Sequence, residues 1–154
     1  MQTSNNEVTE KLLDDVGNHI LFELQENARI SFSELGRRVG LTPPAVAERV
    51  HRMEEAGIIT GYHAHVNPEK LGKPITVYIR VDAMDGDSKP LRRRVQDLAQ
   101  VTECHSLTGT DDLLIKASFA SVHEMEQTLV EIASYGEITT SIVLSSPIAH
   151  RSLR

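Results

Sequence analysis

The sequence is poor in cysteine and in aromatic residues. Its 154 residues include one cysteine, no tryptophan, three tyrosines and three phenylalanines. A single cysteine excludes an intrachain disulfide and is typical of a reducing cytoplasm. No apolar run approaches the roughly 20 residues of a membrane helix, and residues 1–11 lack a signal-peptide core. We therefore expect a cytoplasmic protein without a membrane partner, with a loose tail at residues 1–10.

An excess of positive charge is also lacking. The formal net charge is −6 at pH 7, and acidic residues outnumber basic ones even in the first half of the chain. This balance argues against a polyanionic partner, but the distribution of charge matters more than its sum. Four arginines fall within residues 34–52, where they can gather on one surface: Arg37, Arg38, Arg49 and Arg52.

The chain does contain strong helix signals between residues 31 and 40. Ser31 precedes Glu34 by three positions, which is the spacing of a capping box. The predicted helix buries Leu35 and Val39 and ends at Gly40, which can adopt the left-handed closing conformation.

A second helix signal follows directly. Thr42 can cap this helix with its hydroxyl, and Pro43 suits its first position. Val46, Val50 and Met53 recur with helical spacing, so they form one buried face. The opposite face would enter a major groove of DNA, flanked by the arginines that end the preceding helix. The candidate DNA-binding residues are therefore Arg37, Arg38, Thr42, Pro44, Ala45, Glu48, Arg49 and Arg52.

Glu48 is the unexpected member of that face. It can accept a hydrogen bond from cytosine, form an ion pair with Arg52 four residues later, or repel phosphate. We favour the ion pair with Arg52.

Further signals on both sides complete a module. Asp14 or Asp15 can cap an upstream helix whose shared apolar face is Val16, Ile20, Leu21 and Leu24. Residues 59–66 alternate with period two, which predicts a strand packed beside the helices as a wing. Three helices and a wing form a winged helix-turn-helix, although a structural helical hairpin with solvated arginines has the same spacing.

The second half predicts alternating strands and helices after a polar connector. We expect a strand from residue 75, a helix from Asp87 or Ser88, strands at 101–108 and 112–119, and a last strand at 137–144. Between them, Ser121 and Glu124 have capping-box spacing, Gly136 ends the helix, and its inner face is Val122, Met125, Leu129 and Ile132.

This order predicts an α+β chain whose second part is a ferredoxin-like βαββαβ domain. The expected domains are residues 1–66 and 75–154, joined by a linker at 67–74. Both helices would cover one sheet face, so the half-apolar residues of the other face need a partner. We therefore expect a homodimer that buries Tyr78, Thr102, Leu114 and Val143.

The first half contains a specific combination of short motifs, which continues through Leu71-Gly72. They include Asp14-Asp15, Ala28-Arg29-Ile30-Ser31, Glu34-Leu35, Val39-Gly40-Leu41-Thr42, Arg49-Val50, Met53-Glu54, Gly57-Ile58-Ile59 and Gly61-Tyr62. With these motifs the chain resembles the Lrp/AsnC family of leucine-responsive and asparagine-synthase regulators over nearly its whole length. The resemblance implies a transcriptional regulator that binds double-stranded DNA as dimers, which assemble further into tetramers or octamers. It also implies an amino-acid effector rather than an enzymatic activity.

The segment from Thr108 to Asp112 is a candidate for that effector. A glycine turn exposes backbone N–H groups, and a neighbouring carboxylate can accept an ammonium group. By themselves these residues are more often ordinary turn chemistry. The resemblance matches Thr108, Gly109 and Asp112 to the family's effector loop and Thr140 to a ligand-contacting position. The candidate effector residues are Thr108, Gly109, Thr110, Asp111, Asp112, Thr139, Thr140 and Ser141.

One departure and several alternatives stay open. Ile138 stands where many members of the family have a further threonine, so the effector can differ from a standard amino acid or be absent, which would make an orphan regulator. A metal-responsive sensor would use His63 and His65 on one strand with Cys104 and His105 on another, but no short-spaced set supplies three ligands. We expect no catalytic residues, no metal and no cofactor. The preferred function is a sequence-specific regulator of pseudo-palindromic operators.

Overall fold

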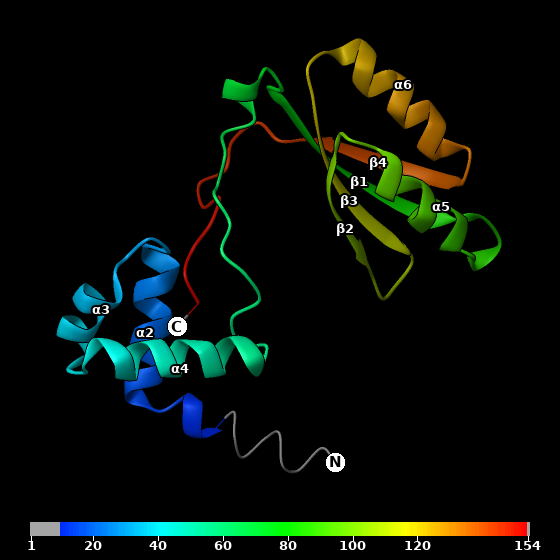
Figure 1. Ribbon diagram of the computed structural model, residues 1–154. Coiled ribbons are helices and arrows are strands. Elements are labelled where there is room, and N and C mark those ends of the chain that lie inside the picture. The colour runs from blue at the N-terminus through cyan, green and yellow to red at the C-terminus, as the bar shows by residue number, and fades with distance from the viewer. Residues whose placement is uncertain (1–9, 154) are drawn as a thin grey trace. The chain divides into compact units, whose positions relative to one another are not determined.

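The computed structural model describes residues 10–153, so nearly all of the expected N-terminal tail lies outside it. The chain divides into two compact units (Figure 1). The helical unit comprises residues 1–65 together with 148–154, and the sheet unit comprises residues 66–147. The expected domain boundaries remain a prediction.

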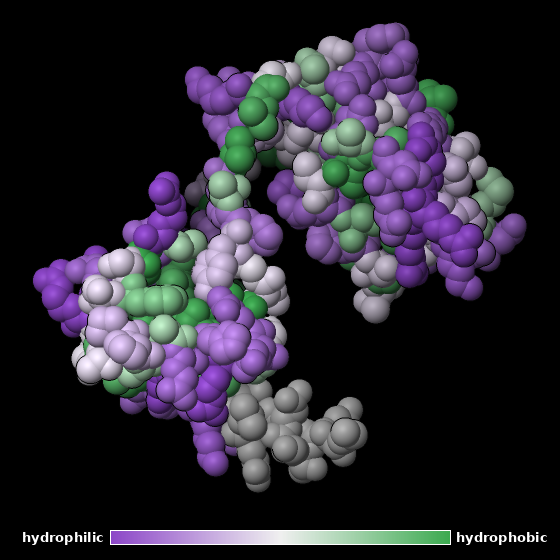
Figure 2. Space-filling model, viewed as in Figure 1, coloured by the Kyte–Doolittle hydropathy of each residue, from purple (hydrophilic) through white to green (hydrophobic). Residues whose placement is uncertain are grey.

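The helical unit is built from three main helices. They are α2 (Asp15–Glu26), α3 (Phe32–Val39) and α4 (Pro43–Glu55). Each predicted apolar face packs inward. Figure 2 shows one side of this unit, where hydrophobic residues gather on the surface with hydrophilic ones around them. The three expected helices are therefore confirmed, with a core of Leu12, Ile20, Leu24, Leu35, Val46, Val50 and Met53.

The ends of α2 and α3 follow the sequence signals. Asp14 caps α2 by accepting a hydrogen bond from the Gly17 amide at 2.7 Å. The Ser31 hydroxyl accepts from the Glu34 amide at 3.2 Å, and Gly40 closes α3 with a φ of 74°. The Glu34 carboxylate binds the arginines at the end of its own helix instead of turning back to the cap residue.

The start of α4 differs from the expectation. Thr42 occupies the cap position but its side chain makes no capping hydrogen bond. Pro43 and Pro44 fill the first two helical positions, and neither has an N–H group to donate. A hydroxyl at the cap normally accepts from the second or third helical residue, so Pro44 removes one of its two usual donors.

The turn between α3 and α4 is unusually close. The Leu41 amide donates to the Gly36 carbonyl at 2.9 Å. A Cβ atom at Gly36 would lie 2.4 Å from the Leu41 carbonyl oxygen. The glycine therefore permits the tight approach that sets α4 against α3.

The predicted wing is wrong. Residues 60–66 contain no strand and are exposed, although they have the alternating pattern. A strand needs a paired neighbour for its backbone groups, and the only sheet of the described residues is the one in the sheet unit. The segment is instead an extended connector, held to α4 by the Tyr62 hydroxyl, which donates to Glu54 at 2.9 Å.

The sheet unit has the expected βαββαβ order. Its main elements are β1 (Ile75–Ala83), α5 (Lys89–Arg94), β2 (Val101–Ser106), β3 (Leu113–Phe119), α6 (Val122–Ala133) and β4 (Gly136–Ile142). Short 3-10 turns lie at Glu69–Leu71, Met84–Gly86 and Val95–Asp97. The strands form one antiparallel sheet in the order β2-β3-β1-β4, with α5 and α6 on one face (Figure 1). The ferredoxin-like prediction is confirmed.

The core of the sheet unit lies between the helices and this face. Alternate residues of β1 and β3 are fully buried there, with one face of each helix packed against them. Val122 does not share that face, because 63% of it is exposed, so its assignment to the inner side of α6 was wrong. Among the described residues, none of the helices combines the length and apolar character needed to span a bilayer.

Gly136 also has a different role from the predicted one. It does not end α6, which stops at Ala133, but is the first residue of β4. It pairs with Ala83, and a Cβ atom would lie 2.1 Å from the Asp82 carbonyl oxygen. A glycine is thus required by the close approach of two strands.

Candidate DNA-binding surface and effector loop

The candidate residues at the cap and along α4 differ in their exposure to solvent. Thr42, Pro44, Glu48 and Arg52 are exposed, whereas Ala45 is partly buried against the unit. Small side chains at the exposed end allow close approach by another molecule, which is how a recognition helix contacts base edges.

Arg49 points to a partner within its own unit. Its Nη1 and Nη2 atoms donate to Oδ1 and Oδ2 of Asp14, both at 2.6 Å. This pair lowers the pKa of Asp14 from 3.8 to about 2, chiefly through the Arg49 hydrogen bonds and secondly through the Gly17 amide. The same hydrogen bonds raise the pKa of Arg49. Arg49 therefore ties α4 to the start of α2, and its expected position on a free outward face was wrong.

The two arginines of α3 are also paired. The Glu34 carboxylate accepts from Arg37 at 2.6 Å and from Arg38 at 2.9 Å. Arg38 also donates to Glu23 of α2 at 2.5 Å. Hydrogen bonds from Arg38 and then Arg37 lower the pKa of Glu34. Arg37 nevertheless keeps 77% of its side chain exposed, so it can still meet a phosphate.

Of the four candidate arginines, Arg52 is the one that forms no ion pair with the described residues. The expected ion pair between Glu48 and Arg52 is absent, and neither residue has an ion pair elsewhere in the part of the chain that the structure describes. Exposed pairs at this spacing are weak, so their side chains gain little by meeting. Arg52 is thus an exposed cation available to a ligand.

The candidate effector loop joins β2 to β3. Thr108, Gly109 and Thr110 are exposed, and Gly109 has a φ of 116°, which favours glycine. Asp111 is partly buried beside them. The loop therefore offers backbone and hydroxyl groups to solvent.

Asp112 already has partners at the base of this loop. Its carboxylate accepts from the Ala83 amide at 2.9 Å, and its own amide donates to the Val81 carbonyl at 2.8 Å. Its carbonyl accepts from the Leu107 amide at 2.8 Å. Asp112 therefore fastens the loop to the end of β1, a role that the sequence pattern did not reveal.

The three candidate residues of β4 point to different sides of the sheet. Thr139 and Ser141 lie opposite Arg80 and Tyr78, on the face that no helix covers. Thr140 pairs with the buried Ile79 and so shares the helix-covered side. A small ligand on one face can contact Thr139 and Ser141 together, but not all three side chains.

The histidines proposed as alternative metal ligands are not gathered into a site. His63 and His65 lie in the connector rather than on a strand, and the His65 ring lies 4.4 Å from the ring of His150. The described residues contain no group of three or more histidine, cysteine or acidic side chains placed to hold a metal ion.

Sequence reasoning missed the acidic partners and the C-terminal contacts. Asp14 caps α2 and Glu23 lies within it, yet they bind Arg49 of α4 and Arg38 of α3 across the unit. Gln25 pairs with Leu153, which is 128 residues further along the chain. No periodic pattern marks such a long-range polar contact, so the single sequence held no signal for it.

Comparison with known proteins matches both units to domains of the same family. The family model of the AsnC-type helix-turn-helix domain matches residues 13–54, and that of the Lrp/AsnC ligand binding domain matches residues 76–153. The second match alone spans just over half of the chain.

Individual relatives agree over most of the length. The chain is 37% identical over 138 residues to the uncharacterized HTH-type transcriptional regulator YezC of Bacillus subtilis, covering 90% of this chain and 98% of YezC. It is 34% identical over 141 residues to the leucine-responsive regulatory protein of Haemophilus influenzae, covering 87% and 85%. A transcriptional regulator of Neisseria meningitidis, solved in complex with L-Met, aligns with a TM-score of 0.85 and 29% identity, covering 92% and 96%.

Proposed function

This chain belongs to the Lrp/AsnC family of DNA-binding transcriptional regulators, a family of regulators and not of enzymes, and we propose that it binds pseudo-palindromic operators as an oligomer. We further propose that an amino acid modulates this binding. The observation that supports the proposal best is the exposed face of α4, which has small residues at its start and the unpaired Arg52 in its last turn.

The ion pairs of the helical unit indicate which of its arginines are available to contact DNA. Arg37 and Arg52 are available at the surface, whereas Arg38 and Arg49 are held by carboxylates. Few free cations for each protomer mean few phosphate contacts, so a single unit should bind DNA weakly. Two units on one operator would raise the effective affinity without new contacts, which favours an oligomer.

The first test replaces Arg52 by alanine. We expect Arg52→Ala to weaken operator binding about tenfold and to reduce the dependence of affinity on salt by about one charge, because one phosphate or base contact is lost. The operator would be selected from genomic fragments and titrated by fluorescence anisotropy at several salt concentrations.

A matched control separates this contact from a change in net charge. Arg93→Ala removes one exposed arginine from α5 in the sheet unit and should leave operator affinity within about twofold. Equal affinities of the wild-type protein and Arg52→Ala for the operator would refute the assignment of this face to DNA.

The amino-acid response is supported by the effector loop and by the L-Met complex of the Neisseria meningitidis regulator. Thr108, Gly109 and Thr110 offer donors at the surface, and Thr139 and Ser141 share one face of β4. Adding L-methionine or L-leucine to the same titration should shift the operator affinity. An affinity that no amino acid changes would contradict the effector part of the proposal.

One observation favours an orphan regulator as the second candidate. The Asp112 carboxylate, which we expected to receive the ligand ammonium group, is partly buried and already accepts from the Ala83 amide. A carboxylate has further acceptor capacity, so the two roles are compatible. Calorimetry with each amino acid would distinguish the candidates, because an orphan regulator would give no heat of binding.

A further inference from the structure

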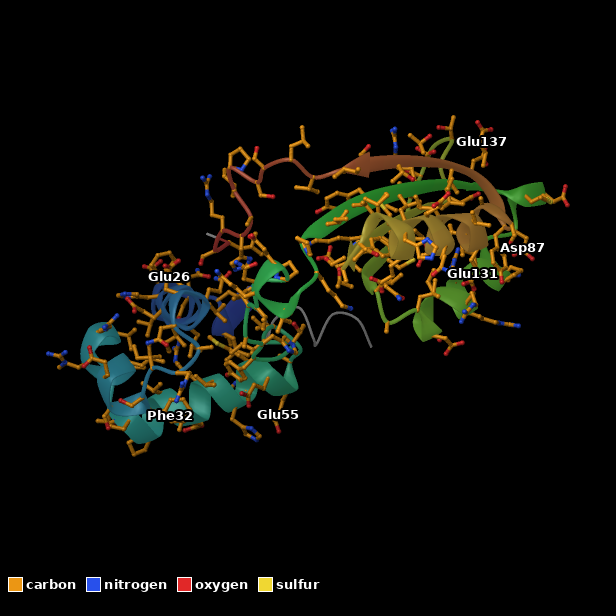
Figure 3. The ribbon with its side chains drawn as sticks, turned by 90° about the horizontal axis from the view of Figure 1, so that it is seen from above. Glu26, Phe32, Glu55, Asp87, Glu131 and Glu137 are labelled. Atoms are coloured by element: carbon orange, nitrogen blue, oxygen red, sulfur yellow. The ribbon has the colours of Figure 1, made fainter. Side chains whose placement is uncertain are left out.

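The C-terminal segment of the chain is attached to the last turn of α2. The Gln25 side-chain amide donates to the Leu153 carbonyl at 3.1 Å, and the Leu153 amide donates to the Gln25 side-chain oxygen at 2.9 Å. The Ser152 hydroxyl donates to the Glu26 carboxylate at 2.6 Å. The segment runs beside α2 in both ribbon views, and Glu26 is labelled there in Figure 3.

This attachment is made by polar groups rather than by a buried side chain. One glutamine satisfies both backbone groups of Leu153, in the way that the edge of a strand would. The Leu153 side chain itself is 83% exposed. The ring contact between His65 and His150 adds a second point, on the connector that follows α4. Such exposed hydrogen bonds can open and close without disturbing the core.

The attached segment is the direct continuation of β4. The strand ends at Ile142, and the Val143 amide still donates to the Thr76 carbonyl at 2.9 Å. A few residues later the chain joins the helical unit, at residue 148. The strand that carries Thr139 and Ser141 is therefore linked to α2 by a short stretch of backbone.

The last turn of α2, to which this segment binds, lies close to an arginine of the candidate DNA-binding surface. Glu23 lies on α2 shortly before Gln25 and Glu26, and its carboxylate binds Arg38 of α3. A change at the end of α2 can therefore reach α3 through a single ion pair.

We propose that residues 148–153 form a C-terminal strap that transmits the state of β4 to the DNA-binding helices. When a ligand at Thr139 and Ser141 alters β4, the strap is released from or held on Gln25 and Glu26, and α2 responds. This inference rests on the proposed function, since it requires that an amino acid changes operator binding. The strap is then the segment through which amino-acid binding at β4 affects the DNA-binding helices.

The attachment is tested first by itself. Gln25→Ala removes both hydrogen bonds to Leu153 from an exposed position. We expect hydrogen exchange in the peptide covering residues 148–154 to become at least about fivefold faster, because its protected amide is freed. The control Gln127→Ala removes an exposed glutamine of α6 that bonds only to His123 of the same helix, and it should leave that exchange unchanged.

The coupling is tested in the full-length protein by anisotropy, with L-methionine and then L-leucine as the probes. In Gln25→Ala the operator affinity without amino acid should stay within about threefold of wild type, while the ratio of affinities with and without amino acid should fall to about one. Gln127→Ala should keep the wild-type ratio, and a chain truncated after Pro147 should behave like Gln25→Ala.

The possible results distinguish the strap from the function on which it depends. A full amino-acid response in Gln25→Ala, or equal exchange of residues 148–154 in wild type and Gln25→Ala, would overturn the strap while leaving the proposed regulator intact. A wild-type operator affinity that neither amino acid changes would count against the proposed function itself.

Discussion

At the scale of single residues, the acidic groups decide which arginines remain available. Asp14 binds Arg49 and Glu23 binds Arg38, and of the four candidate arginines Arg52 alone has no ion pair among the described residues. Charge pairing within the unit therefore focuses the candidate DNA contact on fewer side chains than the sequence suggested.

The Asp14–Arg49 pair makes a prediction about pH. The pKa of Asp14 is lowered from 3.8 to about 2, so its stabilising contribution is present above pH 3.8 and is lost as the pH falls through about 2. We expect NMR titration of the Asp14 carboxyl to give a midpoint of about 2. Asn still caps a helix, so Asp14→Asn should keep the α2 cap but remove this pH-dependent contribution.

The neighbouring Asp15 provides the control. It is an exposed carboxylate in the first turn of α2 with no ion pair among the residues described. Asp15→Asn should leave the loss of stability between pH 3.8 and about 2 as it is in the wild-type protein. A midpoint for Asp14 at its ordinary value of 3.8 would mean that Arg49 is free in solution.

At the scale of elements, the turn between α3 and α4 depends on one close backbone contact. A Cβ atom at Gly36 would meet the Leu41 carbonyl oxygen at 2.4 Å. We expect Gly36→Ala to destabilise the helical unit by about 2 kcal/mol, because the two helices must move apart. It should also weaken operator binding, since α4 changes its position. Urea unfolding monitored by circular dichroism measures the first effect and anisotropy the second.

A serine in the same helix provides the comparison for Gly36. Ser33 is exposed on α3, and alanine has a higher helix propensity, so Ser33→Ala should be neutral or slightly stabilising. Equal unfolding midpoints for Gly36→Ala and Ser33→Ala would show that the turn accommodates a Cβ atom at position 36 without loss of stability.

Elements with local signals could be predicted, and elements that depend on distant partners could not. Ser31, Gly40 and Asp14 fix helix ends through groups within a few residues, so the sequence pattern contains them. The wing failed because alternation at residues 59–66 does not supply a neighbouring strand. The hydrogen-bond partners of Arg49 and Asp112 could not be predicted for the same reason, because they come from other elements.

At the scale of the whole molecule, the sheet face that no helix covers is partly apolar and is expected to pack against a partner. Tyr78 and Leu114 are only partly buried on it, and Lys116 lies over the Tyr78 ring at 6.0 Å while pairing with Glu103 at 2.7 Å. A half-apolar face with organised charges is typical of a protein–protein interface. The family membership and this face together support an oligomer built on sheet contacts.

We expect sedimentation velocity to detect a dimer or a larger assembly of dimers. Leu114→Lys should raise the dissociation constant of the dimer by about tenfold or more, because it places a charge in the centre of the face. Operator affinity should fall with it, since two linked units bind more tightly than one.

Met84 supplies the matched position outside that face. It is 62% exposed in the turn that follows β1, so Met84→Lys adds the same charge at a different surface. We expect it to sediment like the wild-type protein. Identical sedimentation of wild type and Leu114→Lys would indicate that another surface joins the protomers.

The two prolines that open α4 have a consequence for the divergence of regulators. Most helices can bind a phosphate through the free backbone N–H groups of their first turn, whatever their side chains. Here Pro43 and Pro44 have no N–H group to donate, so contact with DNA at this end of α4 depends on a few replaceable side chains. After gene duplication, one or two substitutions on such a helix should suffice to redirect a copy to new promoters while its scaffold stays the same.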